Sequence, residues 1–344
     1  MDAAILYGQE DVRIERIPVP PIGQGEVLLR ICTALTCGTD VKVFKRGYHA
    51  RMLTPPCPFG HEMAGEIEAV GEGVTEWNVG DRVVAANSAP CGICFYCARN
   101  QPELCEDLLF VNGAYAQFIT LPERIVRTNL LRIPRELTFD QAALLEPLAC
   151  VVHGFEESCI QEDHTVAVIG AGPIGLLFAR LCKLAGARVI CVSRNSARLG
   201  VAERIGADVT ISSNDLLDSI ASVRKDANDG RGPDRVIECA GTPESWAQAL
   251  AIVRKGGLVN LFSGCESGTN IILDTARVHY DALTIRATFH HTPQTVRRAL
   301  CLLEENRIQH DLLITDSAEL SDLPLVLRGL AAGDGNLKVA IHPS

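Results

Sequence analysis

The chain has 344 residues, of which 47% are hydrophobic and 22% are charged, with a formal net charge of −10. This balance excludes a disordered chain, and the length favours two domains over one. The acidic charge argues against nucleic acid or an anionic membrane as a partner, because both select clusters of Lys and Arg.

No segment of the sequence predicts export or membrane insertion. Residues 1–15 lack the basic stretch and apolar run of a signal peptide. The most apolar stretch, residues 166–179, is too short and too rich in glycine to span a bilayer. We therefore expect a cytoplasmic protein. In a large chain without an export signal, the 14 cysteines indicate thiolate chemistry or metal binding more than disulfides.

The chain changes character twice, which predicts an α/β protein of two domains. Up to residue 150 the expected strands are short and interrupted by Gly and Pro, at residues 14–19, 26–31, 65–70 and 82–86. Residues 151–290 alternate apolar strands with helical patterns, with strands expected at 166–169, 189–192, 209–212, 236–239, 258–262 and 283–285. This alternation is typical of a doubly wound parallel sheet, the Rossmann fold. Residues 291–344 contain a helical pattern (295–305) and a closing strand (337–341), and we assign them to the first domain.

A glycine-rich turn follows the first of the parallel strands. It comprises Gly170, Gly172, Pro173, Ile174 and Gly175, between the strand and a helical pattern at residues 176–184. Such glycines permit a tight turn, the approach of a pyrophosphate and close packing of helix on strand, while the helix N-terminus favours the phosphates. Although the glycine spacing alone is a weak signal, its place between strand and helix predicts dinucleotide binding.

Four cysteines lie close together in one loop: Cys91, Cys94, Cys97 and Cys105. Four thiolates fill every position of a tetrahedral zinc site, so such a site is structural and leaves no place for substrate. The alternative is a set of buried or disulfide-bonded cysteines, which a reducing compartment and this regular spacing disfavour.

A third group of candidate ligands is dispersed along the chain: Cys37, His61 with Glu62, and Glu146. One thiolate, one imidazole and one carboxylate would give zinc three protein ligands and one open position. Taken singly, each residue has an ordinary structural alternative, such as a core cysteine, a turn histidine or an acidic residue at a helix start.

Together these motifs resemble the zinc-dependent medium-chain dehydrogenases, the alcohol dehydrogenase superfamily. Residues 60–74 match the zinc alcohol dehydrogenase signature in full, and the remaining motifs follow in the order seen in that superfamily. The chain looks most like the sorbitol, threonine and sugar-alcohol-phosphate dehydrogenases. This resemblance implies an irregular β, GroES-like catalytic domain formed by residues 1–150 and 291–344, with the Rossmann domain (151–290) inserted between its two parts.

The resemblance also implies roles for individual residues. Cys37 and His61 would bind the catalytic zinc, and Glu62 and Glu146 are both candidates for its carboxylate ligand. Thr39 takes the position of the hydroxyl that accepts the alcohol proton; its alternative role is that of a turn residue bonding its own backbone.

Lys42 stands where many relatives have a histidine that ends the proton relay. Lysine is a poor relay near neutral pH unless burial lowers its pKa, so the protons would otherwise leave through water. A second interpretation places this lysine in a basic rim suited to a phosphorylated or acidic substrate, and a third treats the loop as merely solvated. The rim would consist of Lys42, Lys45, Arg46, His49 and Arg51.

The predicted activity is reversible hydride transfer between a secondary alcohol, of the polyol, cyclitol or sugar-alcohol type, and NAD(P). A threonine-type amino-alcohol dehydrogenase is one alternative. Two others are a zinc-independent reductase, which the presence of Cys37 and His61 disfavours, and a non-catalytic nucleotide-binding redox sensor.

The nicotinamide preference is predicted from the end of the second parallel strand. An NAD enzyme places a carboxylate there to bind the adenosine ribose, whereas this strand ends in Ser193 and Arg194. Both can bind a 2′-phosphate, and Arg198 follows one helical turn later. NADP is therefore favoured, with NAD possible if Arg194 points to solvent.

Relatives of this type are dimers or tetramers, and we expect a homo-oligomer joined through the last strands of the parallel sheet. Residues 257–262 and 283–285 are apolar enough to form such an edge.

Overall fold

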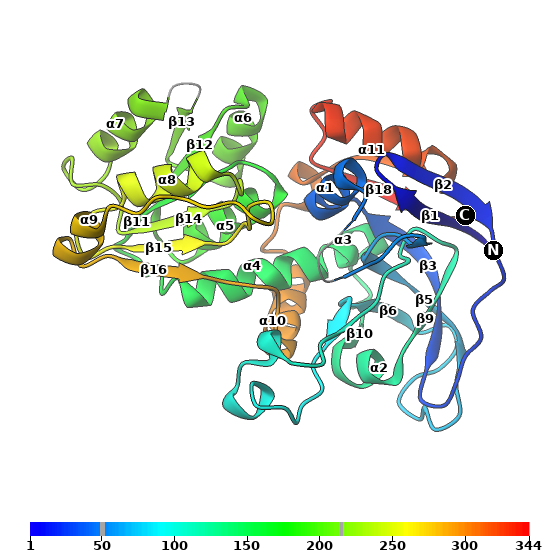
Figure 1. Ribbon diagram of the computed structural model, residues 1–344. Helices are drawn as coiled ribbons and strands as arrows, with labels where there is room; N and C mark the ends of the chain where they lie inside the picture. The colour runs from blue at the N-terminus through cyan, green and yellow to red at the C-terminus, as the bar shows by residue number, and fades with distance from the viewer. Residues whose placement is uncertain (49–51, 214–215, 344) are drawn as a thin grey trace. The chain divides into compact units, whose positions relative to one another are not determined.

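In the computed structural model, which describes residues 1–48, 52–213 and 216–343, the chain divides into two compact units. The first combines Met1–Ala149 with His291–Ser344, and the second is Cys150–His290. Both termini therefore belong to the first unit (Figure 1).

The main sheet of the first unit has the strand order β10-β6-β5-β3-β18-β17, and β9 also pairs with β3. Its inward side chains, such as Leu29, Ile67 and Val83, are almost fully buried. Pairing of β18 with β3 joins the C-terminal segment to the N-terminal one, as predicted for residues 337–341. The strands are β3 (Val27–Leu35), β5 (Glu62–Val70), β6 (Arg82–Ala85), β9 (Phe118–Leu121), β10 (Leu130–Arg132), β17 (Ile314–Glu319) and β18 (Lys338–His342).

Smaller elements surround this sheet. A second sheet has the order β2-β1-β4, and β7 pairs with β8. These strands are β1 (Asp2–Gly8), β2 (Asp11–Arg16), β4 (Cys57–Pro58), β7 (Ser88–Ala89) and β8 (Leu109–Phe110). The helices are α1 (Gly38–Arg46), α2 (Glu123–Asn129), α3 (Phe139–Ala143), α10 (Pro293–Glu304) and α11 (Leu323–Ala332), and α4 (Leu145–Glu157) runs from the first unit into the second.

The predicted strands at residues 26–31 and 65–70 are longer in the structure, as β3 and β5, whereas one predicted strand extends into residues that are not strand. The strand expected at residues 14–19 is β2, which ends at Arg16. Prolines at positions 18, 20 and 21 follow, and they have no N–H group with which to extend the pairing to β1.

The second unit is a parallel sheet with the order β13-β12-β11-β14-β15-β16, connected by helices (Figure 1). Burial of both faces explains why β11 is apolar at all but its first position, and all of its residues are buried. Each predicted strand is confirmed to within two residues. The elements are β11 (Thr165–Ile169), α5 (Pro173–Leu184), β12 (Arg188–Ser193), α6 (Ser196–Ile205), β13 (Val209–Ser212), α7 (Leu216–Asp226), β14 (Arg235–Glu238), α8 (Pro243–Ile252), β15 (Leu258–Leu261), α9 (Thr275–Tyr280) and β16 (Thr284–Ala287).

One part of the edge prediction is wrong. The segment 257–262 forms β15, which lies inside the sheet between β14 and β16. All four residues of β15 are buried, so its apolar character serves the core of the second unit. Among the described residues, β16 is therefore the edge strand on this side of the sheet.

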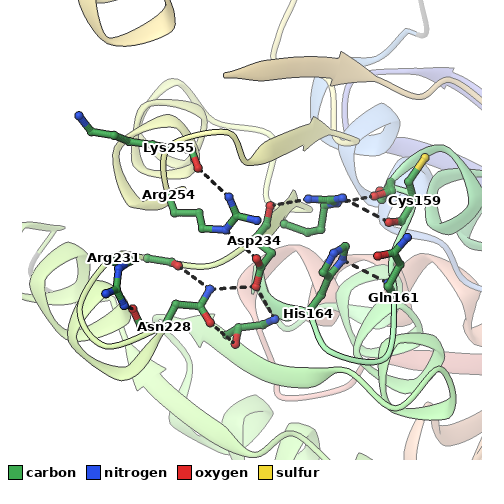
Figure 2. Close-up of polar contacts among 12 residues, drawn as sticks. Cys159, Gln161, His164, Asn228, Arg231, Asp234, Arg254 and Lys255 are labelled. Carbon is green, nitrogen blue, oxygen red and sulfur yellow. Dashed lines mark hydrogen bonds and ion pairs between the residues drawn. The ribbon is translucent and has the colours of Figure 1, made fainter. Parts of the chain in front are cut away.

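A polar cluster fixes the amino ends of β11 and β14 (Figure 2). One carboxylate oxygen of Asp234 accepts hydrogen bonds from the Thr165 N–H at 2.7 Å and from Asn228 Nδ2 at 2.9 Å. The other oxygen lies 2.6 Å from Nε of Arg254. The cluster lies at the opposite end of the sheet from the carboxyl ends of the strands, where ligands bind in open α/β sheets.

Within the described ranges, no helix combines the length and the apolar composition that a membrane crossing requires.

Candidate active site

Cys37 is the N-cap of α1, two residues after the end of β3. Its Sγ accepts a hydrogen bond from the Thr39 N–H at 3.4 Å, while Asp40 Oδ2 accepts one from the Cys37 N–H at 3.1 Å. This capping arrangement fixes the cysteine side chain at a helix N-terminus, where a thiolate is favoured.

His61 immediately precedes β5 and is almost completely buried. Its Nδ1 lies 3.1 Å from Asp40 Oδ1, and the Tyr115 hydroxyl donates to Asp40 Oδ2 at 2.6 Å. Burial acts to lower the pKa of His61, but the charge and hydrogen bond of Asp40 outweigh it and raise the pKa well above its ordinary value. With Nδ1 engaged by Asp40, Nε2 is the nitrogen that can bind a metal.

Glu62, the first residue of β5, forms a buried ion pair. Lys338 Nζ lies 2.7 Å from Oε1 and 2.6 Å from Oε2, and the two side chains are 0% and 2% exposed for Glu62 and Lys338 respectively. Burial raises the pKa of Glu62 to about 7, while the ammonium of Lys338 acts in the opposite direction.

The ligand atoms of Cys37, His61 and Glu62 all lie within 4.8 Å of one another. Glu146 lies in the first turn of α4 and is buried; its carboxylate is outside this group, although its charge also raises the pKa of Glu62. A thiolate, an imidazole and a carboxylate suit zinc with an open position. These residues therefore fit a catalytic zinc ion.

Two further predicted residues lie on α1. Thr39 is partly buried in its first turn, one residue from Asp40, and Lys42 is exposed. Of the basic rim, Lys45 Nζ contacts the Ala331 carbonyl at 3.4 Å, and Arg46 is also exposed. His49 and Arg51 lie outside the described residues.

The four cysteines of the loop after β7 converge as predicted from their spacing. All four Sγ atoms lie within 4.8 Å of one another, and the Cys91 N–H donates to Cys105 Sγ at 3.2 Å. Backbone hydrogen bonds from Cys97 and Glu106 lower the pKa of Cys94 to about 6, whereas burial raises the pKa of Cys105 to about 12. The set fits a structural zinc ion, whose charge would ionise all four thiols.

The glycine-rich turn lies at the carboxyl end of β11. Gly170 has a φ of +101°, and a Cβ on Gly175 would lie only 1.8 Å from the Gly170 carbonyl oxygen, so only glycine fits there. Gly172 is the N-cap of α5 and faces open space; Pro173 and Ile174 form the first turn of that helix. Because Pro is favoured at this helix position, α5 begins three residues before the predicted start at 176.

The end of β12 presents no carboxylate. Ser193 is its last residue, and the Ser193 Oγ accepts a hydrogen bond from the Asn195 N–H at 3.2 Å. Arg194 is exposed, and Arg198, in the first turn of α6, is partly buried. The backbone of Arg198 donates to Asn195 Oδ1 at 3.1 Å.

Three residues of the site were not predicted: Asp40, Tyr115 and Lys338. The sequence could have indicated Asp40, because an acidic residue at the third position of a helix commonly caps the helix N-terminus, and Cys37 is the N-cap here. Tyr115 and Lys338 reach the site through long-range pairing, which no local pattern shows.

Comparison with known families agrees with this geometry. Residues 23–134 match the alcohol dehydrogenase GroES-like domain, and residues 173–305 match the zinc-binding dehydrogenase domain. The chain is 31% identical to a sorbitol dehydrogenase from Bacillus subtilis, covering 100% of this chain and 98% of that protein. It is 33% identical to an L-threonine 3-dehydrogenase from the same organism, over 90% of this chain and 89% of the other.

Among solved structures, a zinc-binding dehydrogenase from Sinorhizobium meliloti, bound to NADP, superposes with a TM-score of 0.90. The two are 29% identical, with 99% of each chain covered.

Proposed function

Because the chain belongs to the zinc-dependent medium-chain dehydrogenases, and is thus an alcohol dehydrogenase dependent on NAD(P), we propose that it oxidises a secondary alcohol of the polyol or sugar-alcohol class. The grouping of Cys37, His61 and Glu62 carries this proposal. A zinc-independent reductase or a non-catalytic sensor would not need this set of zinc ligands.

The residues of the site have separate roles in the proposed reaction. Zinc, when bound by Cys37 and His61 with a glutamate, supplies a Lewis acid that favours the alkoxide form of the alcohol. Asp40 holds the His61 ring in orientation through Nδ1. Thr39 accepts the hydroxyl proton and passes it toward solvent. The N-terminus of α5 would bind the pyrophosphate of NAD(P), the cofactor that would accept the hydride.

The substrate class is inferred from the relatives and the residues together. Relatives named sorbitol dehydrogenase and D-arabinitol dehydrogenase match over nearly the whole chain, which supports a polyol. The threonine dehydrogenases keep an amino alcohol open as the second candidate. Exposed Lys42, Lys45 and Arg46 would suit a phosphorylated polyol.

NADP is the proposed cofactor. A carboxylate at the end of β12 would repel a 2′-phosphate, and this position holds Ser193 followed by exposed Arg194. The relative solved with NADP supports the same choice. NAD remains the alternative, and the ratio of kcat/KM for the two cofactors distinguishes them.

The proposed assembly is a homodimer or homotetramer joined through β16. All four residues of this edge strand are exposed. Apolar side chains in the chain segment before this strand are also exposed, with Ile272 at 98% and Tyr280 at 80%. An exposed edge with apolar neighbours favours pairing with a second copy.

The decisive experiment measures turnover of polyols, secondary alcohols and threonine with either nicotinamide, before and after removal of metal by chelation. We expect polyol oxidation with NADP that chelation abolishes and zinc restores, while nucleotide binding persists. Full activity of the zinc-free protein would contradict the proposed mechanism, and silence across the panel would favour the sensor.

A further inference from the structure

Asn87 lies two residues after β6 and is completely buried, with 0% of its surface exposed. Its backbone carbonyl accepts a hydrogen bond from the Val111 N–H at 2.8 Å. Its side chain is different, since neither Oδ1 nor Nδ2 has a hydrogen-bond partner in the part of the chain that the structure describes. A buried amide without a partner is unfavourable and rare in protein interiors. The fold of the first unit therefore does not explain this side chain.

A second buried amide flanks the same segment. Asn129, the last residue of α2, is also 0% exposed, and its Nδ2 donates to the Ser88 carbonyl at 2.6 Å. Its backbone carbonyl accepts from the Ala86 N–H at 3.1 Å, while its Oδ1 lacks a partner among the residues described. Ser88 Oγ lies 3.4 Å from His291 Nε2. Buried polar groups thus surround Asn87 on the chain, although none of them satisfies its amide.

Strand register places Asn87 beside the candidate zinc site. In the antiparallel pairing of β5 with β6, Met63 lies opposite Ala85. Continued by two residues, this register sets Asn87 opposite His61, which immediately precedes β5. All of these residues belong to the first unit. The unpaired amide is therefore next to a zinc ligand, where a substrate would be within its reach.

The chemistry of the amide indicates what it can bind. An amide group both donates and accepts hydrogen bonds, and so does a hydroxyl group. A polyol carries a hydroxyl on the carbon beside the reacting carbinol, so this second hydroxyl could pair with both atoms. An ammonium group, as in an amino alcohol, only donates and would leave Nδ2 unpaired. A simple secondary alcohol would leave both atoms unpaired.

We propose that Asn87 is a specificity-determining residue that binds the hydroxyl next to the reacting carbinol of a polyol. This inference deepens the proposed function and rests on it. It selects a vicinal polyol over both an amino alcohol and a simple alcohol. Discrimination of this kind is effective because the wrong substrate leaves buried polar groups of the site unpaired.

Two alcohols that differ in one hydroxyl provide the test: butanediol with hydroxyls on its two central carbons, and butanol with a hydroxyl on one of them. Their kcat/KM values are measured with the zinc-loaded full-length protein and the nicotinamide that the wild type prefers. The variants are Asn87→Leu and, as a matched control, Asn112→Leu. Asn112 lies in the same unit, and its Nδ2 donates to the Met52 carbonyl at 2.8 Å.

We expect the wild type to prefer the diol. Asn87→Leu should lower kcat/KM for the diol by about 10- to 100-fold and leave that for butanol unchanged, because only the diol loses a hydrogen-bond partner. The same variant should resist urea better than the wild type, since an apolar side chain replaces an amide without a partner. Asn112→Leu should keep the wild-type preference for the diol.

An Asn87→Leu protein that still prefers the diol would overturn the proposal. If Asn87 were only structural, this variant would keep that preference and resist urea less well. A wild type that oxidises polyols without preferring the diol to butanol would also overturn the proposal, and this result needs no variant to fold. A wild type that oxidises no polyol at all would instead refute the proposed function.

Discussion

At the scale of single residues, Asp40 connects most of the groups around the candidate zinc site. One oxygen faces His61, and the other accepts hydrogen bonds from the Tyr115 hydroxyl and the Cys37 N–H. The side chain is 2% exposed, so water does not compete for these positions. Both proposed ligands, Cys37 and His61, thus depend on one carboxylate for their orientation.

Asp40→Asn should weaken zinc binding by about 10- to 100-fold, as loss of a carboxylate behind a metal-bound histidine commonly does. An amide nitrogen in place of Oδ2 would face two donors and repel them. Competition for zinc with a chromophoric chelator measures the change. Asp11→Asn, at an exposed carboxylate paired with Arg13, is the control. Equal zinc affinity in the wild type and Asp40→Asn would refute this role.

At the scale of elements, the turn between β11 and α5 depends on close contact of backbone with backbone. We expect Gly175→Ala to push α5 away from β11, because its Cβ would lie 1.8 Å from the Gly170 oxygen. Affinity for NADPH, followed by fluorescence titration, should fall at least about tenfold, the equivalent of about 1.4 kcal/mol.

Gly200→Ala is the matched control for this substitution. It lies in α6, where a Cβ would meet nothing within 4 Å, so it should stabilise the helix by about 0.5–1 kcal/mol and leave nucleotide binding unchanged. Tight NADPH binding by Gly175→Ala would show that the turn tolerates a side chain.

The Asp234 cluster gives a prediction with a defined pH dependence. Burial alone would raise the pKa of Asp234, but hydrogen bonds from Asn228, the Thr165 backbone and Arg254 outweigh it and lower the pKa. Its contribution is therefore complete above the unfolded pKa of about 3.9 and disappears as the pH falls through the folded value.

Asp234→Asn should cost about 1–3 kcal/mol at pH 7, and this difference should shrink below pH 4. Trp246, which packs on the core of the second unit, reports its unfolding by urea in a Trp77→Phe background. A stability difference that is constant between pH 7 and pH 3 would rule out the ionised carboxylate as its source.

The same elements show what sequence can and cannot predict. The strands of the second unit were predicted because burial on both faces leaves long β-branched runs, and the cysteine lobe because its ligands are close in sequence. In the first unit, β17 and α2 were not predicted, since their short segments mix polar and apolar residues. In the candidate site, the residues of the motifs could be predicted from the sequence. The contact between Lys338 and Thr36 could not, because the two residues are 302 positions apart and meet only in the folded chain.

At the scale of the whole molecule, the exposed edge strand β16 is the proposed interface between subunits. Ile285→Lys places a charge on this edge, so we expect it to convert an oligomer into monomers at micromolar concentration, as measured by light scattering. Leu325→Lys, which replaces an exposed apolar residue of α11 (65%), should leave the oligomer intact. A monomeric wild-type protein would remove the basis for this prediction.

The pairing of β18 with β3 has a consequence for how the protein is made. A ribosome delivers β3 before every strand of the nucleotide-binding unit and β18 after all of them. The nucleotide-binding unit can therefore fold during translation before β18 is made, whereas the unit with the candidate zinc site must wait until β18 has emerged. Since Lys338 belongs to that final strand, an unfinished nascent chain holds Glu62 without its partner. We therefore expect metal to be taken up in its final coordination only after β18 has emerged, which pulse-labelled zinc in a synchronised translation reaction would detect.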